Sequence, residues 1–343
     1  MKGKVRVGVV GLGIWGQNHA LAYSDYHRCE LSVVCDLDKD RAQELGERYN
    51  CDWTTSVEEL ASGDVEAFSI ATPDFAHFKP ATALLEAGKH VIVEKPLATT
   101  VADAKAMVAT AAKAGTKFMV DFHARWHPLF MGAKAYIEKG ELGEPVMAYA
   151  RLSDTIHVPT EMLGWGGRSG PEWFLFPHTM DVVRWLIERD PVEVYSKGHR
   201  GVLAAKGIDC WDAIQALVEF EGRAFCTFEA SWIVPNSYTN VVDNRLTLYG
   251  TEGGLELRNE PNLWVFTDRF HTPFSSESIT RYGKVSGYQY EPIRYFVDCV
   301  ADDIAPEATG QDGLMVTALI EATLMSLRDG APVRIRDVLN GAS

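Results

Sequence analysis

Three glycines near the N-terminus constrain the fold of this chain more than any other feature. Gly11, Gly13 and Gly16 have the spacing G-x-G-x-x-G, follow the apolar run Val5 to Val10, and precede a helical pattern. In such a strand–turn–helix unit the first glycine permits a tight turn, the second lets the backbone approach a pyrophosphate, and the third allows close packing of the helix. The N–H groups at the start of that helix favour an anion. The pattern therefore predicts a dinucleotide site rather than a purely structural turn.

An acidic residue follows the next expected strand. The run Leu31 to Cys35 ends at Asp36, about 20 residues past the last glycine, where a ribose hydroxyl needs an acceptor. A carboxylate there repels a 2′-phosphate, and Leu37 brings no compensating positive charge. We therefore expect NAD as the cofactor. NADP stays the alternative, because Lys39 and Arg41 lie close by in the sequence.

The first part of the chain alternates strands with helices, which is typical of a parallel sheet covered on both faces. The predicted fold class is α/β, with a doubly wound parallel (Rossmann) sheet in a dinucleotide-binding domain of residues 1–121. The expected strands are Val5 to Val10, Leu31 to Cys35, Asp52 to Thr55, Ala67 to Ala71, Val91 to Val93 and Phe118 to Asp121; the expected helices are Lys39 to Tyr49, Val57 to Ser62, Phe75 to Ala87 and Val101 to Ala114.

The pattern changes after residue 121. A helix is expected over His127 to Lys139, a loop rich in Gly and Trp over His157 to Pro177, and a helix over Thr179 to Glu188. Strands then follow one another without helices, so residues 122–343 are expected to form an α+β substrate-binding and oligomerisation domain on a large, mostly antiparallel sheet. The expected strands are Val146 to Ser153, Val192 to Ser196, Trp211 to Glu221, Ala224 to Ser231, Arg245 to Tyr249, Gly254 to Arg258 and Leu263 to Phe266; helices near Pro292 to Val300 and Gly313 to Arg328 close the chain.

Charge and cysteine content exclude several classes of protein. The formal charge of −14 argues against a nucleic-acid partner, which needs a basic patch. No apolar run is long enough to span a bilayer, and the basic start leads directly into the first strand without a signal-peptide cleavage site. The six cysteines include no C-x-x-C pair, which favours reduced thiols in a cytoplasmic enzyme. An exposed face on the large sheet predicts a homodimer or homotetramer.

Three further motifs complete a recognisable set with the glycine turn: Ala71-Thr-Pro73 with His77, the run Ala87 to Pro96 that ends in Glu-Lys-Pro, and His178-x-x-Asp181. With these residues the chain resembles the Gfo/Idh/MocA family over nearly its whole length. The resemblance implies a nicotinamide cofactor, a sugar, cyclitol or ketone as substrate, Lys95 in the active site, and a cis peptide bond before Pro96. The residues that we expect to bind the cofactor are Gly11, Gly13, Ile14, Trp15, Gly16, Asp36, Thr72, Pro73, His77 and Glu94.

Lys95 and His178 are the candidate catalytic residues. Oxidation of a secondary alcohol needs a base for the hydroxyl proton while hydride leaves for the nicotinamide. Lys95 follows a strand end beside the expected cofactor, although a lysine there can also be a solvated surface charge. His178 can instead be a structural histidine. Asp181, one turn on, is either a substrate contact or a partner of the helix dipole.

One position departs from the family pattern. Many members carry an aspartate four residues before this histidine, where this chain has Phe174, and nothing in the sequence shows that Glu172 replaces it. The departure reduces the implied catalytic triad to two residues and makes that wall of the pocket apolar. In the loop ahead of it, Trp165 and Trp173 are candidates for stacking on a sugar ring, with ordinary packing or an oligomer contact as the equal alternative.

His123 is expected to contact the substrate. Its spacing of four residues from His127 could suggest zinc, but Pro128 interrupts the helix start and no third ligand is evident, so no metal site is predicted. The leading interpretation is an NAD(P)-dependent dehydrogenase acting on CH–OH groups of a sugar, glycoside or cyclitol. Two alternatives stay open: glycoside cleavage through transient oxidation by bound NAD, and a non-catalytic sugar or nucleotide sensor.

Overall fold

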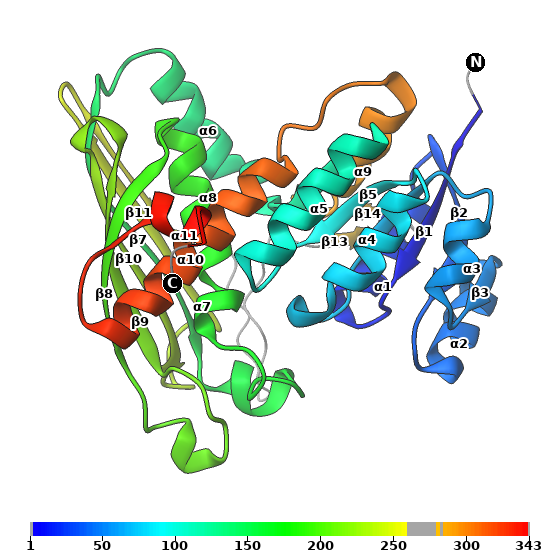
Figure 1. Cartoon of the computed structure of the whole chain (residues 1–343), viewed down its shortest axis with the longest axis horizontal. Coiled ribbons are helices and arrows are strands. Elements are labelled where there is room, and N and C mark those ends of the chain that lie inside the picture. The colour runs from blue at the N-terminus through cyan, green and yellow to red at the C-terminus, as the bar shows by residue number, and fades with distance from the viewer. Residues whose placement is uncertain (1–2, 259–278, 282–283, 342–343) are drawn as a thin grey trace. The chain divides into compact units, whose positions relative to one another are not determined.

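The computed structural model describes residues 3–258, 279–281 and 284–341 (Figure 1). They form two compact units, each discontinuous in sequence: the described residues of Met1–Trp126 and Glu277–Thr317 make the first, and those of His127–Ser276 and Ala318–Ser343 the second. The strand expected over residues 263–266 lies outside the described residues. No helix in the described part of the chain combines the length and apolar character needed to cross a bilayer.

The first unit is built on a parallel sheet of six strands. Its order is β3-β2-β1-β4-β5-β6 and every pair of neighbours is parallel, so the predicted doubly wound Rossmann sheet is confirmed. The strand order reverses between β1 and β4, which is where such sheets bind ligands, beyond the carboxyl ends of the strands. The strands are β1 (Val5–Val10), β2 (Cys29–Cys35), β3 (Asp52–Thr54), β4 (Ala67–Ile70), β5 (His90–Glu94) and β6 (Phe118–Asp121).

Local signals in the sequence explain where the helices of this unit begin and end. Asp38, Ser56 and Thr100 each accept a hydrogen bond from the backbone three residues on and so cap α2, α3 and α5. α2 and α5 end at Asn50 and Gly115, both in the left-handed conformation. The helices are α1 (Ile14–Ser24), α2 (Lys39–Tyr49), α3 (Val57–Ser62), α4 (Phe78–Glu86) and α5 (Val101–Ala114), with 3₁₀ turns η1 (Asp74–Ala76) and η2 (His123–Trp126).

A C-terminal segment completes the first unit. α9 (Glu291–Asp302) packs against α1, β1, β5 and β6. Arg28 ties it down through ion pairs of 2.6 Å to both Asp298 and Asp302, and the Thr317 hydroxyl donates to the Ala98 carbonyl. The compact unit is therefore larger than residues 1–121, because contacts distant in sequence recruit this segment. A functional boundary at residue 121 stays a prediction.

The second unit is built on a seven-stranded sheet of order β12-β11-β7-β10-β9-β8-β15. β7 and β10 are parallel and all other neighbours are antiparallel, as the mostly antiparallel prediction required. One face is covered by α8 (Phe176–Ile187), which packs on β7 and β10, and by α6 (Pro128–Glu138), which packs on α8. The strands are β7 (Pro145–Thr155), β8 (Pro191–His199), β9 (Ala213–Phe220), β10 (Phe225–Val234), β11 (Val242–Gly250), β12 (Gly254–Arg258) and β15 (Val333–Arg334).

Two expectations for the second unit were wrong in detail. The segment expected to be a loop contains a π-helical turn (Val158–Met162) and the short helix α7 (Pro171–Phe174). α8 begins at Phe176 rather than Thr179, because a proline such as Pro177 is accepted in the first turn of a helix, where its missing N–H has no intrahelical partner. His178 therefore lies inside the first turn of α8.

The remaining elements of the two units are β13 (Ile279–Arg281), β14 (Lys284–Ser286), α10 (Gly310–Asp329), α11 (Ile335–Leu339), η4 (Ala204–Lys206) and η5 (Glu221–Arg223).

Candidate active site

The glycine turn after β1 has the backbone geometry that the sequence predicts. Gly11 has a φ of +86°, which favours glycine, and its N–H donates to the Cys35 carbonyl over 2.8 Å. A Cβ on Gly16 would lie 1.7 Å from the Gly11 carbonyl oxygen. At Gly13, in contrast, no described atom beyond its chain neighbours lies within 4 Å of the position that a Cβ would take. The fold itself therefore requires Gly11 and Gly16, whereas Gly13 is the one that leaves the turn open to an approaching group.

The Asp36 carboxylate is held against this turn. Its Oδ2 accepts a hydrogen bond from the Leu12 N–H at 2.6 Å and its Oδ1 accepts one from the Asp38 N–H at 2.9 Å. The side chain is 12% exposed, and the guanidinium of Arg41 lies 3.5 Å from Oδ2. Both oxygens keep further lone pairs. The residue is therefore oriented by the backbone and can still accept hydrogen bonds from a ribose.

The turn after β4 is linked to the segment after β5 by His77. One ring nitrogen, Nδ1, lies 2.8 Å from the Pro96 carbonyl oxygen, and Nε2 lies 2.9 Å from the Thr72 carbonyl oxygen. The hydroxyl of Thr72 is buried and has no hydrogen-bond partner among the described residues. A buried hydroxyl without a partner costs free energy. Such a group at the carboxyl end of a central strand is suited to a ligand.

These observations fit a dinucleotide. Asp36 would hold the adenosine ribose, the open backbone at Gly13 and the N-terminus of α1 would receive the pyrophosphate, and Thr72 would contact the remaining part. Ile14 and Leu37, which are 59% and 94% exposed, flank this position with apolar surface. A bound nicotinamide would supply the hydride acceptor or donor.

Lys95 follows β5 directly and is 6% exposed. Its peptide bond to Pro96 is cis, as the resemblance implies. The preceding residue orients it, because the Lys95 N–H donates to Oε2 of Glu94 over 3.2 Å. Glu94 is itself 4% exposed. The lysine is thus part of a buried and ordered strand end rather than a solvated surface charge.

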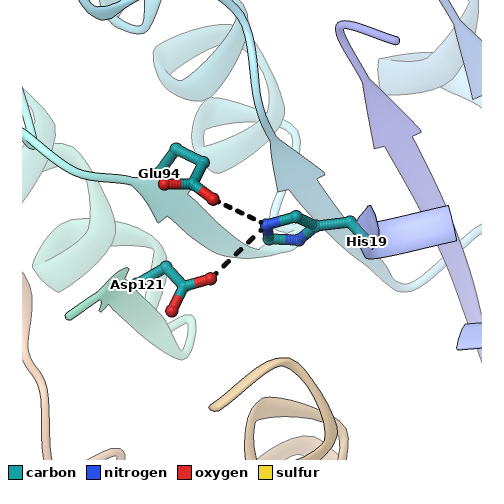
Figure 2. Close-up of side chains that lie close together, drawn as sticks. All are labelled: His19, Glu94 and Asp121. Carbon is teal, nitrogen blue, oxygen red and sulfur yellow. Dashed lines mark hydrogen bonds and ion pairs between the residues drawn. The ribbon is translucent and has the colours of Figure 1, made fainter. Parts of the chain in front are cut away.

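Sequence reasoning missed a buried cluster beside this strand end. His19 on α1 directs Nε2 toward Oε1 of Glu94 at 3.1 Å and toward Oδ2 of Asp121, at the end of β6, at 3.4 Å (Figure 2). Its Nδ1 lies 2.8 Å from the Ser69 hydroxyl, which lies 2.6 Å from the Tyr23 hydroxyl. The only sequence signal was a histidine three residues after Gly16, on the helix face that must pack on the sheet.

Burial and charge perturb all three groups. Burial lowers the pKa of His19, but its hydrogen bonds to Asp121 and Glu94 outweigh this and raise that pKa to about 9. Burial also raises the pKa of Asp121, to about 6, against the opposing hydrogen bond from His19. For Glu94 burial opposes ionisation, yet the hydrogen bond and charge of His19 and the charge of Lys95 hold its pKa below the ordinary value. At neutral pH the cluster is an imidazolium between two carboxylates.

The first unit also brings Trp15 and His123 together. Their rings stack with centroids 5.7 Å apart and an interplanar angle of 23°, and Tyr288 packs on the same histidine at 5.8 Å. His123 is 8% exposed. His127 has a different place, because its Nδ1 accepts the Leu129 N–H and caps α6. The expected cofactor contact and the expected substrate contact are therefore neighbours in the structure.

In the second unit, Phe174 occupies an aromatic cluster. Its ring centroid lies 6.0 Å from that of Trp165 and 5.6 Å from that of Trp232. Trp173 is buried in α7, and Asp181 on α8 is fully buried. The His178 N–H donates to the Leu175 carbonyl over 3.1 Å. The position where many family members carry an aspartate is thus apolar here in structure as well as in sequence.

Comparison with known proteins agrees with these features. Residues 5–122 match the family model described as "Oxidoreductase family, NAD-binding Rossmann fold" and residues 130–256 match the "GFO/IDH/MocA C-terminal domain", together more than half of the chain. The chain is 29% identical over 346 residues to Inositol 2-dehydrogenase 1 of Saccharopolyspora erythraea, covering 96% of each chain. It is 27% identical over 296 residues to 1,5-anhydro-D-fructose reductase of Ensifer adhaerens, covering 82% of this chain and 83% of that protein.

A solved structure shares the fold. The scyllo-inositol dehydrogenase from Lactobacillus casei with bound NAD(H) and scyllo-inositol superposes with a TM-score of 0.82 at 18% identity, covering 97% of this chain and 99% of that chain. At this identity the likeness concerns the fold alone. Together with the two matching models, the glycine turn, Glu94-Lys95-Pro96 and the six-stranded parallel sheet, it leads to one conclusion: this chain belongs to the GFO/IDH/MocA family of oxidoreductases, with an NAD-binding Rossmann domain.

Proposed function

We propose that this chain is an NAD-dependent oxidoreductase that transfers hydride between nicotinamide and a secondary alcohol or ketone of a sugar, glycoside or cyclitol. The observation that carries the proposal is the buried Lys95 at the carboxyl end of β5. The glycine turn and Asp36 follow the carboxyl ends of β1 and β2 in the same parallel sheet. The names of the relatives, an inositol dehydrogenase and an anhydrofructose reductase, support this class of substrate. In this proposal the unit with the Rossmann sheet binds the cofactor and the second unit binds the substrate and forms the oligomer.

Each proposed site residue has a chemical task. The Lys95 ammonium would donate a hydrogen bond to the substrate oxygen and so hold and polarise it. The His178 imidazole would accept the hydroxyl proton during oxidation and return it during reduction. The bound nicotinamide takes up or delivers the hydride. His123, Asp181, Trp165 and Trp173 are proposed substrate contacts, and the cofactor contacts are those expected from the sequence.

Asp36 supports NAD over NADP. Its carboxylate is fixed by two backbone hydrogen bonds and is mostly buried. A 2′-phosphate would meet this negative charge at short range. Arg41 beside it attenuates the repulsion, because its guanidinium lies 3.5 Å away. We therefore propose a preference for NAD rather than an absolute exclusion of NADP.

The aromatic cluster around Phe174 supports a substrate with an apolar portion. Because the rings of Phe174, Trp165 and Trp232 lie together, a glycoside with a hydrophobic aglycone is expected to be a better substrate than free glucose. Such rings gain free energy by removing apolar surface from water.

An apolar stripe supports self-association. Cross-strand neighbours on one face of the second sheet are Tyr249 opposite Met147, and Met147 opposite Phe225. All three side chains are at least 40% exposed, and Leu217 on β9 is 48% exposed. Contiguous exposed apolar residues mark interaction surfaces. We propose that this face joins copies of the chain into a homodimer or homotetramer. Light scattering of Phe225→Glu should show a smaller particle than the wild type, and an unchanged mass would refute this assignment.

The six cysteines support a reducing, cytoplasmic setting for the enzyme. All of them are free thiols in the structure, and burial raises the pKa of Cys35 to about 12, which keeps it protonated and unreactive.

The test of the proposed function is NADH formation. Purified protein with NAD is mixed with a panel of pyranoses, alkyl and aryl glycosides and cyclitols, and NADH absorbance and glycoside cleavage are both followed. A sustained rise of NADH with at least one compound is the expected result. Cleavage without net NADH would instead assign the redox-neutral reaction, and tight sugar binding with neither product would assign a sensor.

A further inference from the structure

The buried cluster of His19, Glu94 and Asp121 has no catalytic role in the proposal above, where only Glu94 is named, as an expected cofactor contact. Glu94 and Asp121 are the last residues of β5 and β6, and His19 reaches them from α1, the helix that follows the glycine turn (Figure 2). Its three side chains are at most 6% exposed. Water therefore screens their charges poorly, and a change in charge is felt across the strand ends.

The three side chains of the cluster do not balance one another's charges. One imidazole faces two carboxylates, with Nε2 3.1 Å from Glu94 and 3.4 Å from Asp121. One protonated imidazole balances only one of them. The second oxygen of Asp121, Oδ1, is buried without a hydrogen-bond partner among the described residues. The charge of Lys95 acts on both carboxylates, yet the pKa of Glu94 is lowered and that of Asp121 is raised, so Asp121 is the less stabilised of the two negative charges.

The nicotinamide half of a dinucleotide belongs near this cluster. Asp36 after β2 holds the adenosine side, so the other half of the cofactor extends across β1 toward β4 and β5. The nicotinamide ring carries a positive charge when oxidised and none when reduced. A fixed negative charge close by therefore interacts with one form of the cofactor more strongly than with the other.

We propose that the His19–Glu94–Asp121 cluster is a buried countercharge that favours binding of NAD⁺ over NADH, with Asp121 as the residue that carries the effect. This inference rests on the proposed function, because it requires a nicotinamide cofactor on the first unit. In this inference Asp121 does not touch the cofactor. Its charge acts on the nicotinamide directly through space and indirectly through Lys95, whose own charge interacts with both carboxylates. The sign does not depend on the state of Lys95, since removing one negative charge weakens NAD⁺ binding in either case.

The experiment measures dissociation constants of NAD⁺ and NADH by calorimetry on the full chain, without any substrate. In Asp121→Asn the ratio of the NAD⁺ constant to the NADH constant should rise by about tenfold at about pH 8. Asparagine is isosteric and its Oδ1 can still accept the His19 N–H. Asp298→Asn is the matched control. It also removes a carboxylate from the first unit, because Asp298 on α9 forms an ion pair with Arg28, and it should leave the ratio unchanged.

The pH dependence separates charge from structure. Because the pKa of Asp121 is about 6, lowering the pH from about 8 to about 5 protonates it in the wild type and should raise the same ratio. Asp121→Asn should lack that part of the change. The other titratable groups around Asp121 are His19 and Tyr23 on α1, Glu94 at the end of β5, Lys95 directly after it, and His123 after β6. Their contribution remains in the variant and is subtracted by the comparison.

A second substitution tests whether the cluster acts as a unit. In His19→Gln the two carboxylates lose the shared proton and repel each other, so Asp121 is expected to hold a proton of its own. Asp121→Asn should then change the ratio less in the His19→Gln background than in the wild type.

The outcomes are distinct. A raised ratio in Asp121→Asn with a diminished pH response supports the inference. An unchanged ratio in a folded Asp121→Asn overturns it while the proposed function stands, and binding of neither cofactor form overturns both. If the variant does not fold, the wild-type pH profile decides, because a flat ratio overturns the inference.

Discussion

The two glycines of the turn after β1 allow a matched pair of substitutions with opposite expected effects. An ideal Cβ at Gly16 lies 1.7 Å from the Gly11 carbonyl oxygen, whereas one at Gly13 meets no described atom within 4 Å. Carbon and oxygen make contact at about 3.3 Å, so Gly16→Ala must displace the backbone by about 1.5 Å. We expect this variant to lose at least about 3 kcal/mol of stability, the upper end of ordinary overpacking, because the obstacle is backbone.

Gly13→Ala should leave the fold nearly intact. Gly13 has a φ of −67°, which alanine adopts freely, and it is the N-cap residue of α1. Replacing a glycine N-cap by alanine costs roughly 0.5–1 kcal/mol. The new methyl group would instead stand where the backbone must approach the pyrophosphate. The dissociation constant for NAD should therefore rise by at least about tenfold, which corresponds to about 1.4 kcal/mol.

Two assays read the pair. Thermal or urea unfolding of the cofactor-free proteins gives stability, and calorimetric titration with NAD gives affinity. Gly13→Ala should melt near the wild type and bind weakly, and Gly16→Ala should melt far below it. Wild-type affinity in Gly13→Ala, or wild-type stability in Gly16→Ala, would refute the assignment of these two roles.

Two further predictions concern charge. Asp36→Asn should lower the preference for NAD over NADP by about tenfold or more, as titration with both cofactors would show, whereas Asp38→Asn, which removes another carboxylate paired with Arg41, should leave the preference nearly unchanged; equal effects of the two substitutions would contradict the role of Asp36. His19, whose folded pKa of about 9 exceeds its ordinary 6.5, contributes stability that is fully present below about pH 6.5 and is lost as the pH rises toward 9, by at most about 3 kcal/mol. Unfolding free energies of the wild type and His19→Gln should therefore converge over this pH range, and parallel curves would contradict the raised pKa.

Local patterns carried most of the fold prediction. The expected bounds of β1, α2, α3, α5 and β6 agree with the structure to the residue, because capping residues and glycines fix these elements within a few positions of the chain. The alternation of strands and helices predicted a parallel sheet, and with it the end of the sheet at which the site residues lie. The turn around His178 was placed less well, since periodicity does not reveal that Phe176 and Pro177 start a helix.

Contacts between residues far apart in the sequence could not be predicted from sequence patterns. The assignment of α9 to the first unit depends on Arg28 meeting Asp298 and Asp302, more than 260 residues away. The sequence did not predict the His19 cluster for the same reason. Its members lie on α1, β5 and β6, and only the order of the strands brings the ends of β5 and β6 together beside α1. His19 and Asp121, the other two members of the cluster, belong to none of the sequence motifs described above.

The most direct test of the central claim compares Lys95→Ala with the wild type, using the best compound from the substrate panel. NADH formation and the NAD dissociation constant are measured on the same preparations, with unfolding curves to verify the fold. We expect turnover to fall by roughly a hundredfold or more, since Lys95 positions and polarises the reacting oxygen, while NAD binding weakens by no more than about threefold. Near-normal turnover in a folded Lys95→Ala would contradict the claim that this buried lysine acts on the substrate.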